Sequence, residues 1–189
     1  MKVPYSVQSA ADQLGIKGKL KNEQVIRIKS VLNGKDQLLI YPVGYGKSAI
    51  FQIPAIINDN RPTIVFEPTI SLMYDQVQRL NACGVSAEFL SHRNREDHAD
   101  ILEDYQKGFV TLLYVTPERI NDPTFRTAIE KNPPWLVVVD EAHCVIEWGI
   151  SFRPDYHKIS KFMKRLEGQP VHAYHEGDAA RDAVSALGR

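Results

Sequence analysis

The chain has 189 residues, 43% of them hydrophobic and 24% charged, and its 23 basic side chains are balanced by 23 acidic ones. This length predicts one domain with a sizeable core, because soluble domains have roughly 100 to 200 residues. A net charge of zero offers no general argument for nucleic-acid binding, so any such contact must depend on local clusters. Neither a membrane span nor a secretory signal is predicted, and a cytoplasmic protein is the default expectation.

The two cysteines, Cys83 and Cys144, lie far apart and have no partners at metal-ligand spacing. They suggest neither a disulfide framework nor a zinc site, and we expect both to be buried thiols. The histidines show no shared spacing that would favour a metal.

Short apolar runs rich in β-branched residues alternate with longer amphipathic stretches. In chain order, the spacing predicts a helix over 23–32, a strand over 37–41, a helix over 48–58, a strand over 63–66, a helix over 71–82, a strand over 85–90, a helix over 95–107, a strand over 110–115, a helix over 118–131, a strand over 135–139 and a helix over 154–166. This alternation predicts an α/β fold: a doubly wound, mostly parallel sheet with helices on both faces.

A glycine-rich turn joins the first predicted strand to an apolar helix. It reads Pro42-Val43-Gly44-Tyr45-Gly46-Lys47-Ser48. Glycines let backbone N–H groups face a phosphate, Lys47 can reach the outer phosphates, and the Ser48 hydroxyl can bind Mg²⁺. Gly44, Tyr45, Gly46, Lys47 and Ser48 are therefore candidate nucleotide-binding residues. The alternative is a simple glycine turn capped by Ser48.

A second motif favours the nucleotide interpretation. The last clear strand ends in Asp140-Glu141-Ala142-His143. The ends of parallel strands face the ligand crevice, where Asp140 can hold Mg²⁺ and Glu141 can orient and deprotonate the attacking water. His143 could sense the phosphate. The alternative is a solvated acidic turn, but together with Lys47 and Ser48 the motif predicts hydrolysis of a nucleoside triphosphate.

From Leu20 to about Arg165 the chain resembles the first RecA-like lobe of the RecQ family of DNA helicases, in helicase superfamily two. The most specific likeness covers residues 140–156, which look like the family's DEAH-type second motif and the aromatic-rich loop after it. Residues 70–77 resemble motif Ia, and residues 112–119 resemble a segment that touches DNA. The likeness implies a P-loop NTPase lobe at 1–170, a diverged tail at 171–189 and the absence of a second lobe.

The resemblance implies ATP and Mg²⁺ as cofactors, with Gln24 reading the adenine, and roles in DNA repair and recombination. It implies that Trp148, Phe152 and Arg153 meet single-stranded DNA, and this residue composition also suits base stacking and phosphate contact. Two aromatics at the edge of a core are the alternative. Expected partners are single-stranded DNA or duplex junctions, and a second helicase lobe or partner protein, with no membrane. The implied location is the bacterial nucleoid, or the nucleus in a eukaryote.

Several positions depart from the family pattern. Val43 replaces a threonine, Lys21 replaces an arginine, and Glu67 puts a negative charge near the expected DNA path. In the aromatic loop, Glu147 replaces a glutamine, Ile150 a histidine and Ser151 an aspartate, and the Thr-Ala-Thr motif expected after residue 171 is absent. Two hypotheses remain. The chain is either the ATP-hydrolysing lobe of a helicase, with weak activity alone, or a catalytically degenerate lobe that binds nucleic acid or a protein.

Overall fold

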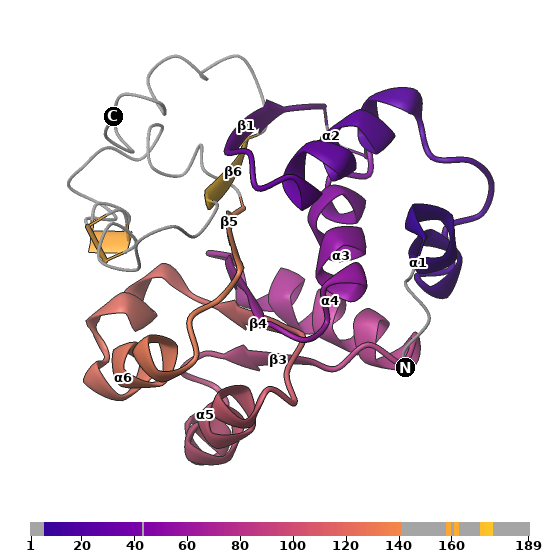
Figure 1. Ribbon diagram of the computed structural model, residues 1–189. Helices are drawn as coiled ribbons and strands as arrows, with labels where there is room; N and C mark the ends of the chain where they lie inside the picture. The colour runs from indigo at the N-terminus through magenta and orange to yellow at the C-terminus, as the bar shows by residue number, and fades with distance from the viewer. Residues whose placement is uncertain (1–5, 43, 141–157, 160, 163–170, 176–189) are drawn as a thin grey trace.

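The computed structural model describes residues 6–42, 44–140, 158–159, 161–162 and 171–175 (Figure 1). The strands are β1 (Gln37–Ile40), β2 (Thr63–Phe66), β3 (Ala87–Leu90), β4 (Leu112–Val115), β5 (Leu136–Val139) and β6 (Val171–His175). The helices are α1 (Val7–Gln13), α2 (Asn22–Leu32), α3 (Ser48–Ile57), α4 (Ile70–Ala82), α5 (His98–Lys107) and α6 (Pro123–Lys131), with short 3₁₀ helices η1 (Arg95–Asp97) and η2 (Pro117–Asn121).

The described strands form one sheet in the order β1-β6-β5-β2-β4-β3, and every neighbouring pair is parallel. Phe66 at the end of β2 is level with Val139 of β5 and Val115 of β4, and Val115 is level with Leu90 of β3. The residues that follow these strands therefore emerge in a row at one edge of the sheet. This edge is where ligands bind in open α/β sheets.

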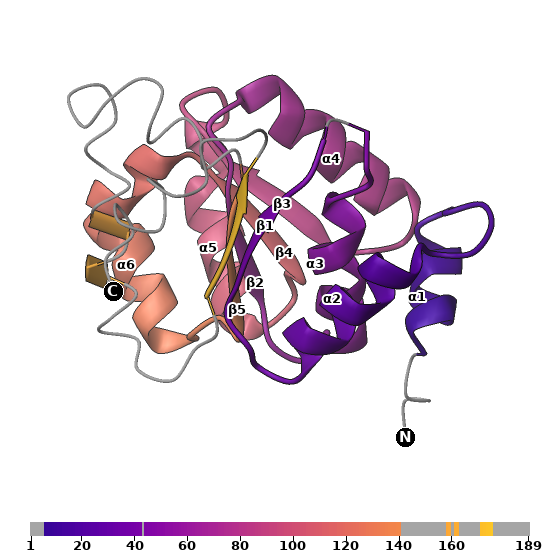
Figure 2. The same cartoon turned by 90° about the horizontal axis from the view of Figure 1, so that it is seen from above.

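Helices cover both faces of the sheet, and Figure 2 shows α1 to α4 on one side and α5 and α6 on the other. Neighbouring strand residues consequently join different cores: Val138 of β5 packs in the core beneath α1 to α4, and Val137 packs in the core beneath α5 and α6. Both side chains are fully buried. The α/β fold with a parallel sheet that the sequence predicts is confirmed.

Two predicted helices are divided in the structure. The stretch over 95–107 begins as η1 and continues as α5, and the stretch over 118–131 is divided into η2 and α6 at Asp122. The cause of the second break is Pro123, because a proline disfavours helical geometry in the residue before it. Asp122 is extended, with φ −78° and ψ 117°, and its side chain accepts hydrogen bonds from the first backbone N–H groups of α6.

Two elements have no counterpart among the predicted ones. Helix α1 packs through Ala10 and Ala11 onto the core formed with α3, and seven residues are too few for a clear periodic signal. Strand β6 lies between β1 and β5, so the sheet extends past the boundary at residue 170 that the sequence suggests. Its sequence, Val-His-Ala-Tyr-His, lacks the continuous apolar run of the other strands.

Within the described ranges, no helix is long and apolar enough to cross a membrane, and no group of three or more histidine, cysteine, aspartate or glutamate residues could hold a metal ion. Cys83 is a free thiol and is half-buried, because it ends α4 near the surface and is not part of the core. Cys144 lies outside the described residues. Of the helix predicted over 154–166, residues 158–159 and 161–162 are helical, and Ile159 and Phe162 are buried in the core beneath α5 and α6.

Candidate functional site

The turn between β1 and α3 brings backbone N–H groups to the carboxyl edge of the sheet. Gly44 and Gly46 have φ values of 75° and 86°, in the left-handed region that glycine adopts without strain. Lys47 is already helical, and Ser48 is the first residue of α3. The helix that follows is almost wholly buried, so its N-terminus is held rigidly at this edge. Such a turn can bind an anion through backbone N–H groups and the helix dipole.

The two glycines differ in what surrounds them. A Cβ added at Gly46 would lie 2.8 Å from Nε2 of Gln24, whereas a Cβ added at Gly44 would meet nothing within 4 Å. Gly46 therefore permits a close approach of α2 to the turn. Gly44 leaves open space on its side of the turn.

Gln24 of α2 holds the turn by its main chain. Its Nε2 donates to the carbonyl oxygens of Tyr45 at 3.3 Å and Gly46 at 3.2 Å, and its Oε1 accepts from the Lys21 N–H at 2.9 Å. The side chain is only 6% exposed. Both amide atoms of the residue predicted to read adenine are thus engaged within the chain.

An aromatic pair braces the turn against the start of α2. The rings of Tyr41 and Tyr45 stack with centroids 4.3 Å apart, and the Lys21 ammonium lies 3.8 Å from the centroid of the Tyr45 ring. The Tyr41 hydroxyl donates to Glu23 at 3.0 Å, and Arg27 donates to the same carboxylate oxygen at 2.8 Å. The hydrogen bonds from Arg27 and Tyr41 hold the pKa of Glu23 below its ordinary value, and burial raises the pKa of Tyr41.

Asp140 and Glu67 follow β5 and β2, two adjacent strands. Asp140 is half-buried, and its backbone N–H donates to the Phe66 carbonyl oxygen at 2.9 Å. Glu67 is 4% exposed, and its carboxylate accepts from the Thr69 N–H at 2.8 Å. The sequence suggests that Glu67 places a negative charge near the DNA path, but the structure turns this carboxylate inward, where it accepts a backbone hydrogen bond.

The glycine turn at residues 44–47 and Asp140 lie at the same edge but do not follow adjacent strands. Strand β6 separates β1 from β5, so these two strands are about 10 Å apart across the sheet at the ordinary strand spacing. Their ends are staggered, because Ile40 of β1 is level with His175 of β6 and Val139 of β5 is level with Ala173. Ser48, at the start of the helix after β1, supplies a hydroxyl at this edge, and Asp140, directly after β5, supplies a carboxylate. Oxygen donors of this kind are the ligands that Mg²⁺ prefers.

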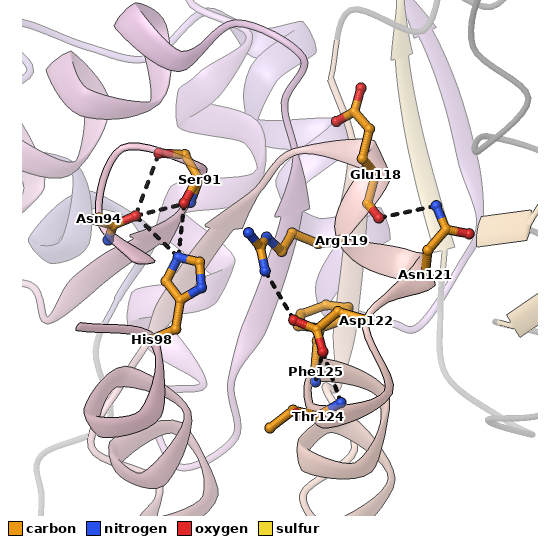
Figure 3. A network of polar contacts seen from close by, with 9 residues as sticks. All are labelled: Ser91, Asn94, His98, Glu118, Arg119, Asn121, Asp122, Thr124 and Phe125. Atoms are coloured by element: carbon orange, nitrogen blue, oxygen red, sulfur yellow. Dashed lines mark hydrogen bonds and ion pairs between the residues drawn. The ribbon is translucent and has the colours of Figure 1, made fainter. Parts of the chain in front are cut away.

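A second polar cluster lies where β3 and β4 end (Figure 3). Arg119 of η2 donates to the Asp122 carboxylate at 2.9 Å, and its guanidinium extends toward the imidazole of His98. His98 Nε2 lies 2.9 Å from the Ser91 carbonyl oxygen, so this nitrogen carries the proton and donates. The carboxylate of Glu118 points away from the Arg119–Asp122 pair. Arg119, the last residue of the segment 112–119 that resembles a DNA-touching motif, is thus held in place by Asp122.

The structure brings together only part of the predicted site. It places Gln24, Gly44, Tyr45, Gly46, Lys47 and Ser48 around one turn, with Asp140 at the same edge. Glu141, His143, Trp148, Phe152 and Arg153, like Val43, lie outside the described residues.

Sequence reasoning missed Gln52 and Gln76, which join α3 to α4. The available signal was Gln52 itself, a polar residue four positions after Ser48 in an otherwise apolar helix.

A family model described as DEAD/DEAH box helicase matches residues 21–175. The chain belongs to this family. It is 41% identical over 153 residues to a probable ATP-dependent DNA helicase, RecS of Bacillus subtilis (strain 168), and 37% identical over 147 residues to the ATP-dependent DNA helicase RecQ of Haemophilus influenzae. The alignments cover 80% and 77% of this chain, but only 30% and 24% of the relatives. The chain therefore spans less than a third of these DNA helicases, and its resemblance to the RecQ family is confirmed.

Solved helicase structures share the fold. The DUF1998 helicase MrfA bound to DNA has a TM-score of 0.75 and 16% identity, covering 96% of this chain and 28% of that protein. The Pyrococcus furiosus Hef helicase domain has a TM-score of 0.66 and 17% identity, covering 95% of this chain and 37% of the other. At this identity the likeness establishes the RecA-like α/β fold of the lobe, and nothing about its ligands.

Proposed function

We propose that this chain is the N-terminal nucleotide-binding lobe of a RecQ-type, ATP-dependent DNA helicase, which binds and hydrolyses ATP with Mg²⁺ and couples this to contact with single-stranded DNA. The observation that carries the proposal is the turn at Gly44 and Gly46, which leads into the N-terminus of a buried helix at the carboxyl edge of the sheet. This is the arrangement that binds phosphate in P-loop proteins.

The residues present fit ATP and Mg²⁺. In this proposal the phosphate lies against the turn at Gly44, where an added Cβ would meet nothing within 4 Å, and Lys47 meets its charge. The hydroxyl of Ser48 and the carboxylate of Asp140 supply oxygen ligands for a cation. Bound Mg²⁺ would neutralise charge on the phosphates. In this proposal Glu141 orients the attacking water and accepts its proton, and His143 senses the phosphate.

On the DNA side, we assign Trp148 and Phe152 to base stacking and Arg153 to phosphate contact, with single-stranded DNA or a duplex junction as the partner. Relatives named as DNA helicases support this role. Because those relatives are more than three times as long as the matched segment, we expect a second lobe or partner protein to complete the cleft with an arginine. Turnover by the present chain alone is then slow.

The rival function is a degenerate lobe that binds nucleic acid or a protein without turnover. It is favoured by the hydrogen bonds of Gln24 Nε2 to the Tyr45 and Gly46 carbonyl oxygens, because at least one of them must break before this amide nitrogen can donate to adenine. The substitutions at Val43 and Ile150 point the same way.

One experiment separates the two functions. Binding of a fluorescent ADP and hydrolysis of ATP are measured with and without single-stranded DNA, for the wild-type chain, Lys47→Ala and Lys35→Ala. Lys35 is an exposed lysine before β1 and is the matched control. We expect DNA-stimulated turnover that is lost in Lys47→Ala and kept in Lys35→Ala. DNA binding that is indifferent to nucleotide, with no turnover in any chain, would establish the rival.

A further inference from the structure

A chain of side-chain hydrogen bonds joins the first residue of the nucleotide-binding helix to α4. Nε2 of Gln76 on α4 donates to Oγ of Ser48 at 3.5 Å, and Nε2 of Gln52 donates to Oε1 of Gln76 at 2.9 Å. Ser48 and Gln52 are four residues apart on α3, so they lie on one face of that helix. This face meets Gln76 of α4.

The orientation of the Gln76 amide is determined by its neighbours. Arg79, three residues later on α4, donates from NH2 to the same Gln76 atom at 3.2 Å. A guanidinium can only donate, so the atom it faces must be the amide oxygen. The nitrogen of Gln76 is then the atom that faces Ser48, and a flipped amide would place two donors against each other.

The network is anchored in the core. Gln52 and Tyr114 are each 1% exposed, and Nε2 of Gln52 also donates to the Tyr114 hydroxyl at 3.0 Å. Buried polar groups are costly unless they are hydrogen-bonded, so this arrangement holds Gln76 in one position. Tyr114 lies close enough to Asp140 for that carboxylate to help burial raise its pKa. The network thus connects the Ser48 hydroxyl, through Gln76 and Gln52, to the buried Tyr114 of β4.

A serine hydroxyl has one hydrogen and two acceptor lone pairs. The N–H of Gln76 occupies one lone pair of Ser48, which leaves the other lone pair for a cation. We propose that Gln76 is a positioning residue, which orients the Ser48 hydroxyl toward the Mg²⁺ of the nucleotide site. This inference depends on the proposed function, since without Mg²⁺-nucleotide there is nothing to position.

The test is the Mg²⁺ dependence of ADP binding. Affinity for a fluorescent ADP is measured in EDTA and at rising Mg²⁺ for the wild type, Gln76→Met, Ser48→Ala and the double variant. Methionine keeps the length of the side chain and removes its hydrogen bonds. Gln78→Met, at an exposed glutamine two residues along α4, is the matched control, and thermal unfolding of each variant checks the fold.

We expect Gln76→Met to bind ADP in EDTA as tightly as the wild type does. The gain in ADP affinity on adding Mg²⁺ should be about tenfold smaller than in the wild type, a loss typical of residues that orient metal ligands. In the Ser48→Ala background the same change should cost nothing further, because its target is gone. Gln78→Met should match the wild type throughout.

The inference is wrong if Gln76→Met loses the same affinity with and without Mg²⁺, if its loss adds fully to that of Ser48→Ala, or if it loses nothing. The last result, with wild-type binding that Lys47→Ala abolishes, overturns the role of Gln76 and leaves the proposed function standing. If the wild-type chain has no affinity for Mg²⁺-ADP, the proposed function fails and the role of Gln76 fails with it.

Discussion

At the scale of single residues, Gly44 and Gly46 of the glycine turn have similar conformations but different surroundings. Both need a left-handed backbone, but only Gly46 also needs the absence of a side chain, because Gln24 lies where its Cβ would be. The sequence motif treats the two positions alike. Their difference arises from α2, which approaches the turn from elsewhere in the chain.

Alanine substitutions should expose this difference. Gly44→Ala is expected to cost about 1 kcal/mol of unfolding free energy, the ordinary strain of a left-handed alanine, and Gly46→Ala should cost more. In a Gln24→Ala background the excess at Gly46 should vanish, because the clash is removed. Urea unfolding measures all of these variants. Equal losses at the two glycines in the wild-type background would contradict the packing described for Gln24.

His98 makes stability depend on pH. Burial, and then the nearby Arg119, lower the pKa of His98 below its ordinary value of 6.5. A lowered pKa means that the unfolded chain takes up the proton first, so the stabilisation is present above about pH 6.5 and is lost as the pH falls through the lower folded value. We expect His98→Gln to show a smaller fall in melting temperature between about pH 7.5 and about pH 5.

The control for this prediction is His92→Gln, at an exposed histidine in the same loop region. It should retain the wild-type pH dependence. If His98→Gln and the wild type have parallel melting curves across this range, protonation of His98 is not coupled to folding.

At the scale of elements, Asp122 stabilises the junction between η2 and α6 that Pro123 imposes. The Asp122 carboxylate accepts from the Thr124 N–H at 2.9 Å and pairs with Arg119, so it caps the helix and anchors the preceding turn together. Pro123 at the first helical position lacks an N–H that would otherwise need a partner.

Removing the Asp122 carboxylate should destabilise both η2 and α6. Asp122→Ala is expected to lower the free energy of unfolding by about 1 to 2 kcal/mol. Asp122→Asn should lose less, because an asparagine oxygen still caps the helix and only the ion pair with Arg119 is weakened. Urea denaturation compares the two. A loss as large in the asparagine variant would show that the ion pair, and not the cap, carries the stability.

At the scale of the whole molecule, the central strands β2, β4 and β5 of the parallel sheet each contribute to two cores. Val137 and Val138 are neighbours in β5 and are buried on opposite faces. A sheet with one solvated face would bury only one of them.

Replacing a buried valine by alanine on either face of the sheet should therefore lower the free energy of unfolding by a similar amount. Val137→Ala and Val138→Ala are each expected to cost about 2 kcal/mol, from lost burial and the small cavity left behind. Ile26→Ala, at a position 56% exposed on α2, should change stability by less than about 0.5 kcal/mol. A small loss at only one of the two valines, measured by urea unfolding, would show that its face is not tightly packed.

The sequence alone determined the class of fold, and it predicted the main residues of the candidate site. Continuous apolar strands such as Leu136–Val139 require cover on both faces, and this predicted the parallel sheet. The glycine turn before Ser48 and the carboxylate after β5 were visible as local patterns, and the family match confirms the resemblance that they suggested. These features are local, because each depends on residues adjacent in the chain.

Only the tertiary structure decided what surrounds those residues. Strand β6 could not be read from its sequence because its conformation depends on pairing with β1 and β5, which contribute the hydrogen bonds on either side. The hydrogen bonds of Gln24 to the glycine turn and of Gln76 to Ser48 join residues 21 to 28 positions apart. A hydrogen bond between distant side chains leaves no periodicity in the sequence. It exists only once packing of the sheet has placed α2 and α4 beside the turn.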